Sequence, residues 1–189
     1  YLPEWVDWSH KVLVEGGCCA TWYGNLYFPQ LLDAMGKRLN YRWIVTYSYT
    51  SPGLIVHPTG MLCSCCLCAV YHKGMWEKMG CSVMDLVPNL PLKNKTIHPC
   101  QKKLEQMLHL VEHFTKPGDL IVDPCAGSGT TAEACFRLGR RFLGCDIDPM
   151  CVPMWQDRFN RVKEEGFDEL FSSARVTGEA EEPVTKNAA

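Results

Sequence analysis

The part of this chain best suited to chemistry is a turn of small residues followed by an acid. The turn spans residues 124–129 (PCAGSG), and the acid is Asp146. Gly127 and Gly129 let the backbone bend tightly and approach a ligand, because neither has a Cβ. Amides at a turn that opens a helix can donate hydrogen bonds to a negatively charged group. A carboxylate about 20 residues later can accept hydrogen bonds from two ribose hydroxyls. This spacing predicts a site for a nucleotide-type ligand.

An α/β unit must position these groups. Residues 120–122 (LIV) are typical of a buried strand, and residues 130–138 predict a helix that Gly139 ends. Residues 141–145 predict a second strand, which ends at Asp146. Strand, glycine turn, helix, strand and acid is the order found in nucleotide sites of doubly wound sheets. A packing turn without a ligand would also use glycines, but the full string DPCAGSGTT with its acid favours a site. No Gly-Lys-Ser/Thr follows, which disfavours a phosphate-binding loop.

The rest of the chain predicts more elements of the same kind. Apolar residues at helical spacing predict helices, and alternating or continuous apolar runs predict strands. The expected helices are residues 1–14, 28–39, 100–114 and 150–165, and the further expected strands are residues 18–23, 41–49 and 69–74, the last ending in a turn. Residues 80–95 lack periodicity and contain two prolines, which predicts a surface loop. The expected fold is a Rossmann-like α/β sheet with helices on both faces.

Length and composition limit the class of protein. With 189 residues, 47% hydrophobic and 21% charged, the chain predicts one globular domain. No apolar run approaches a membrane span and no signal peptide opens the sequence, so we expect a cytoplasmic protein without a membrane partner. The formal charge of -2 means that any DNA contact must come from a local basic patch. Residues 91–104 carry four lysines and no acid, and these could contact phosphates: Lys93, Lys95, Lys102 and Lys103.

Twelve cysteines are many for a chain of this size. The run at residues 63–68 (CSCCLC), with His57, His72 and Cys81 nearby, raises the possibility of zinc. It lacks the separated Cys-x-x-Cys pairs of structural zinc sites. Cys65 and Cys66 would also face opposite sides of a strand. We therefore predict no metal, and reduced, packed thiols.

Two motifs resemble one family. The string around residues 123–131 resembles the S-adenosylmethionine-binding motif of the DNA amino-methyltransferases, which modify adenine N6 or cytosine N4. Residues 97–104 (IHPCQKKL) resemble that family's His-Pro-x-Gln-Lys-Pro segment, with Lys103 in place of the usual proline. Their order matches the permuted subgroup, in which the catalytic half precedes the cofactor turn. The resemblance extends from about Trp5 to Phe159.

The resemblance implies methyl transfer from S-adenosylmethionine to an exocyclic amine of double-stranded DNA, with adenine N6 favoured over cytosine N4, within a restriction-modification system. It places Asp146 on the ribose, residues 123–125 near the methionine end, and residues 98–102 near the methionine carboxylate. The cofactor-binding residues it implies are His98, Gln101, Lys102, Asp123, Pro124, Cys125, Gly127, Ser128, Gly129, Thr130 and Asp146. It also implies a division into the rest of the catalytic half (1–49), a target-recognition insert (50–96) and a cofactor half (97–171). Residues 172–189 predict a disordered tail.

The family's catalytic tetrapeptide, Asp/Asn/Ser-Pro-Pro-aromatic, does not occur in the chain. Asp123-Pro124-Cys125 and Asp148-Pro149-Met150 come nearest, and both lack the second proline and the aromatic residue. We therefore assign no catalytic residue and expect the chain to begin just after the tetrapeptide. Two alternatives remain open: an inactive cofactor-binding module or accessory subunit, and a methyltransferase acting on RNA or protein.

Overall fold

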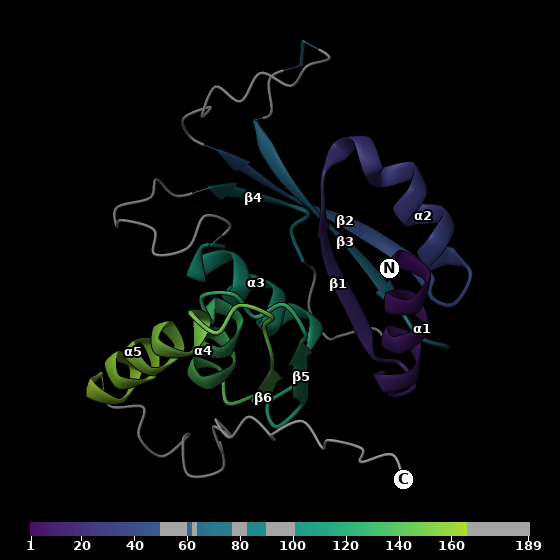
Figure 1. Ribbon diagram of the computed structural model, residues 1–189. Helices are drawn as coiled ribbons and strands as arrows, with labels where there is room; N and C mark the ends of the chain where they lie inside the picture. The colour runs from purple at the N-terminus through teal and green to yellow at the C-terminus, as the bar shows by residue number, and fades with distance from the viewer. Residues whose placement is uncertain (50–59, 62–63, 77–82, 90–100, 166–189) are drawn as a thin grey trace, which may run out of the picture.

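The computed structural model describes residues 1–49, 60–61, 64–76, 83–89 and 101–165 (Figure 1). His98 and the expected tail at residues 172–189 lie outside these ranges. The elements in chain order are α1 (Leu2–Val12), β1 (Cys18–Tyr23), the 3-10 helix η1 (Asn25–Tyr27), α2 (Phe28–Gly36), β2 (Asn40–Tyr49), β3 (Cys65–His72), β4 (Leu86–Asn89), α3 (Leu104–Phe114), β5 (Leu120–Asp123), α4 (Thr130–Arg137), β6 (Arg141–Gly144) and α5 (Cys151–Glu164). No helix of this described part is long and apolar enough to span a membrane.

The strands form two sheets. The larger has the order β1-β3-β2-β4, with β3 antiparallel to both of its neighbours and β4 parallel to β2. The smaller is the parallel pair β5-β6. Within the described ranges, β1 and β5 each have one edge without a partner strand. The expected class of fold, an α/β sheet with helices on both faces, is confirmed.

The central strand β3 separates two hydrophobic cores. Cys68 and Val70 face a core shared with α3 and α4, whereas Ala69 and Tyr71 face a core shared with α1 and α2. Successive side chains of a strand point to opposite faces, so a continuous apolar run suits a strand buried on both sides. Figure 1 shows the same layering, with α1 and α2 on one side of the large sheet and α3 on the other.

The expectation of a loop at residues 80–95 is wrong in part. The predicted loop at residues 80–95 contains β4, which pairs with β2 from Thr46 to Tyr49. Pro88 made a strand here look unfavourable, because proline is confined to edge strands and bulges. The structure accommodates Pro88 because β4 is an edge strand of the described sheet. Residues 65–72, within the expected target-recognition insert, form β3 of the large sheet. The division into parts stays a prediction.

The cysteine run lies partly on β3. Cys68 is fully buried, and Cys65 and Cys66 are half-buried and lie next to each other along the strand. Burial raises the pKa of Cys68, and raises that of Cys19 on β1 to about 12, so these thiols stay protonated at neutral pH. The absence of a zinc site stays a prediction, because His57, Cys63 and Cys81 lie outside the described residues.

Candidate functional site

The glycine turn connects β5 to α4 through left-handed backbone conformations. Gly127 has φ 50° and Gly129, the N-cap of α4, has φ 75°. A Cβ built on Gly129 would lie 2.7 Å from Cδ1 of Trp155. Glycine is therefore required at position 129 both by its backbone conformation and by the indole packed against it.

Asp146 lies against this turn. Gly127 N–H donates a hydrogen bond to Oδ2 of Asp146 at 2.7 Å, and Asp148 N–H donates to Oδ1 at 3.0 Å. The parallel pairing of β5 with β6 brings the two segments together, since Asp123 is the register partner of Gly144. Ala126 N–H also donates to Cys145 O at 3.0 Å. Two segments 19 residues apart thus form one unit, with the carboxylate beside the bend.

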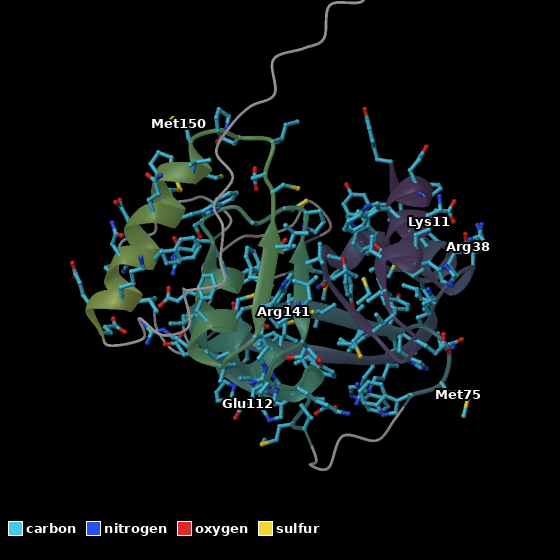
Figure 2. The ribbon with its side chains drawn as sticks, turned by 90° about the horizontal axis from the view of Figure 1, so that it is seen from below. Lys11, Arg38, Met75, Glu112, Arg141 and Met150 are labelled. Carbon is cyan, nitrogen blue, oxygen red and sulfur yellow. The ribbon has the colours of Figure 1, made fainter. Side chains whose placement is uncertain are left out.

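Three predicted site residues start the turn at the carboxyl end of β5. Asp123 accepts a hydrogen bond from Cys125 N–H at 3.0 Å, which closes a local side-chain turn. Asp123 and Pro124 are half-buried and Cys125 is exposed. In Figure 2, Met150 lies at the end of the molecule toward which β5 and β6 run, and Arg141 lies at their opposite end. The turn and Asp146 therefore occupy the carboxyl edge of the parallel pair, where such sheets bind ligands.

Ser128 lies in the turn, and Thr130 is the first residue of α4. Both side chains are buried, and their hydroxyl oxygens are 3.2 Å apart, within hydrogen-bond distance. They stabilise the turn from within. Their expected donation to a ligand stays a prediction.

Gln101 and Lys102 precede α3. Nζ of Lys102 lies 4.7 Å from the ring centroid of Trp22 and 3.8 Å from Sγ of Cys66. This ammonium therefore contacts β1 and β3 of the large sheet. Gln101 is half-buried, and His98 lies outside the described residues.

The sequence did not reveal three polar residues that support the turn. Trp155 and Arg158 of α5 donate hydrogen bonds to its carbonyl oxygens, and Glu133 of α4 pairs with Arg158. The helical spacing of apolar residues indicates only that Trp155 faces the protein core, and not that its indole N–H bonds to the turn. The available signal for Glu133 was an acid flanked by alanines, Ala132 and Ala134, within the helix TTAEACFR.

Exposed thiols beside the turn give a testable prediction. Burial, followed by the charges of Asp123 and Asp146, raises the pKa of the Cys125 thiol. Because the thiolate is the reactive form, we expect Cys125 to react slowly with an alkylating reagent at pH 7 and faster as the pH rises. Asp146→Asn removes one of these charges, so it should lower the pKa and speed the reaction at a given pH. Peptide mapping by mass spectrometry measures each cysteine separately. Equal rates in the two proteins would show that the carboxylate does not act on this thiol.

Comparisons with known proteins agree with this fold. A family model described as DNA methylase (N6_N4_Mtase) matches residues 69–157. The Type II methyltransferase M2.DpnII of Streptococcus pneumoniae is 47% identical over 67 residues, which are 35% of this chain and 25% of that protein. The matched segment thus spans about a quarter of the length of this curated relative.

Solved structures show the same fold along most of the chain. A structure of M1.HpyAVI, described as an M1.HpyAVI–SAM complex, has a TM-score of 0.74 at 21% identity and covers 84% of this chain and 81% of its own. The cytosine-N4-specific PvuII DNA methyltransferase has a TM-score of 0.69 at 18% identity, with coverages of 90% and 76%. The fold is that of the DNA methyltransferases. The match to the DNA methylase family model covers residues 69–157, a little under half of the chain.

Proposed function

We propose that the glycine turn and Asp146 bind S-adenosylmethionine, and that the chain is the cofactor-binding part of a DNA amino-methyltransferase. The observation that carries the proposal is the 2.7 Å hydrogen bond from Gly127 N–H to the Asp146 carboxylate. It supports the proposal because a carboxylate that could accept hydrogen bonds from a ribose lies beside the left-handed backbone of Gly127 and Gly129. When bound, S-adenosylmethionine would supply an activated methyl group on its sulfonium.

The residues present fit this cofactor. The Asp146 carboxylate accepts hydrogen bonds from two backbone N–H groups, and a carboxylate is an acceptor that suits ribose hydroxyls. The turn ends at the N-terminus of α4, where a partial positive charge favours anionic groups. We propose that residues 123–125 lie near the methionine end. His98, Gln101 and Lys102 would lie near its carboxylate.

The substrate is proposed to be double-stranded DNA, with adenine N6 as the target amine. Such an amine is paired within the duplex, so the base must be turned out of the stack before transfer, which costs a few kcal/mol. The chain's own contribution is to position the cofactor and exclude water, since well-oriented reactants need much less activation. No residue of this sequence forms the family's tetrapeptide, so we assign none to the base.

Calorimetry on the folded chain tests the proposed site. We expect S-adenosylmethionine to bind at one site per chain. The absence of binding by a chain that is folded by circular dichroism would contradict the proposal.

A transfer assay tests the target. Double-stranded DNA and RNA of the same sequence are incubated with labelled S-adenosylmethionine and digested to nucleosides. We expect N6-methyladenine from DNA, whereas N4-methylcytosine or RNA product would correct the target. Cofactor binding without transfer would instead support a binding module. The codons upstream of Tyr1 discriminate further, because an Asp/Asn/Ser-Pro-Pro-aromatic string there supports the enzyme.

A further inference from the structure

Two side chains of α5 hold consecutive carbonyl oxygens of the glycine turn. The indole Nε1–H of Trp155 donates to Gly127 O at 2.6 Å, and Nε of Arg158 donates to Ser128 O at 2.8 Å. The two residues are three positions apart, so they lie on the same face of the helix. Side chains on one face of α5 therefore hydrogen-bond two successive peptide groups of the turn.

The neighbouring carbonyl oxygens of the turn are also bonded. Ala126 O accepts from Gly129 N–H at 2.8 Å, and Gly129 O accepts from Glu133 N–H at 3.1 Å. In a trans peptide the C=O and the following N–H point in opposite directions. Fixing Gly127 O with Trp155 therefore also fixes the direction of the Ser128 N–H. The carbonyl oxygens of residues 126 to 129 are thus all hydrogen-bonded. Gly127 N–H and Gly129 N–H donate within this unit, to Asp146 and to Ala126 O, so the amide that the Trp155 contact directs away from α5 is that of Ser128.

The arginine is held in place by a buried ionic network. Arg158 and Glu133 are each 5% exposed and form a salt bridge. Nη2 of Arg137 lies 2.9 Å from the other oxygen of Glu133 and also pairs with Glu165. Burying charges is unfavourable unless they are paired and hydrogen-bonded. Apolar side chains would be enough to pack α5 against α4. The buried ion pairs do something more specific, because they hold the Arg158 guanidinium where its Nε–H donates to Ser128 O.

We propose that Trp155 and Arg158 are positioning residues for the cofactor turn. They keep its backbone in the conformation that directs the Ser128 N–H away from α5, toward the proposed S-adenosylmethionine site, and that leaves no room for a Cβ at residue 129. This inference rests on the proposed function, because it assigns a role in binding that same cofactor. Neither residue is expected to contact the cofactor.

Trp155→Phe tests the indole contact most cleanly. It removes the N–H donor and keeps an aromatic ring beside Gly129. The net value of one neutral hydrogen bond corresponds to a rise of about 2- to 10-fold in the Kd of S-adenosylmethionine. Arg158→Lys keeps the positive charge beside Glu133 and removes the fork that reaches both the carboxylate and Ser128 O. We expect it to raise Kd about 10-fold or more.

The control is Val162→Ala, a cavity variant of the same helix. Val162 is fully buried on α5 and has no part in the turn. Both Trp155→Phe and Val162→Ala should lower the melting temperature, but only the former should raise Kd, measured where all the proteins are folded. Amide exchange of Ser128 and Gly129 in the cofactor-free protein should also speed up in Trp155→Phe and Arg158→Lys only.

The outcomes separate the two proposals. If the wild-type chain does not bind S-adenosylmethionine, the proposed function fails, whatever the variants do. If it binds and the two variants bind equally well with unchanged exchange, Trp155 and Arg158 only pack α5 and the positioning role is wrong. Equal weakening by Val162→Ala would overturn it as well, because general loosening of α5 would then explain the effect.

Discussion

Replacing Asp146 by Ala is expected to weaken S-adenosylmethionine binding by about 100-fold or more. Each hydrogen bond to a charged acceptor contributes about 1.5–3 kcal/mol, and two ribose hydroxyls would lose their acceptor. A loss of about 3 kcal/mol of binding free energy corresponds to a rise of roughly 100-fold in Kd. The variant also loses the acceptor for Gly127 N–H, which loosens the turn. Isothermal calorimetry measures the change.

A matched control separates the site from general charge effects. Asp157→Ala removes the same charge from an exposed position on α5. It should leave Kd unchanged within about 2-fold, as expected for a surface substitution. Asp146→Asn keeps one acceptor oxygen and should fall between the wild type and Asp146→Ala. Equal affinity of Asp146→Ala and Asp157→Ala would remove Asp146 from the site.

Gly129→Ala is expected to lower the free energy of unfolding by about 2–5 kcal/mol. The left-handed conformation at φ 75° costs a residue with a Cβ about 1–2 kcal/mol. The new Cβ would lie 2.7 Å from Cδ1 of Trp155, and such overpacking typically costs about 1–3 kcal/mol more. Relief of the contact would push the indole away from Gly127 O, so cofactor affinity should fall as well. Urea denaturation measures the stability change.

Gly139→Ala is the control for the backbone effect alone. Gly139 follows α4 with φ 70°, and a Cβ there meets nothing within 4 Å. It should lower stability by about 1–2 kcal/mol and leave cofactor affinity unchanged. If both alanine variants lost the same stability, the Trp155 contact would not constrain the turn.

The relation between the turn and the acid could be predicted from the sequence because it is local. Strand, turn, helix and strand follow one another within about 30 residues, and a parallel β5-β6 pair must place the residues after its two strands side by side. Gly139, which follows α4, could likewise be located from a short-range signal. The expected helix at residues 100–114 begins only at Leu104, where Lys103 N–H donates to Gln106 Oε1.

The rest depended on contacts between distant segments. Trp155 and Arg158 reach the turn from about 30 residues away, with polar atoms that helical periodicity assigns to packing or to the surface. The antiparallel insertion of β3 between β1 and β2 is a matter of strand pairing, which apolar patterns do not encode. The four-residue strand β4 contains Pro88 and shows no periodicity, so it resembled a loop.

The most direct measurement is an experimental structure of the chain with S-adenosylmethionine. We predict that both ribose hydroxyls donate hydrogen bonds to the Asp146 carboxylate, and that the methionine part lies over residues 123–129. A cofactor bound elsewhere on the folded chain, or one whose ribose faces away from Asp146, would contradict the proposed site.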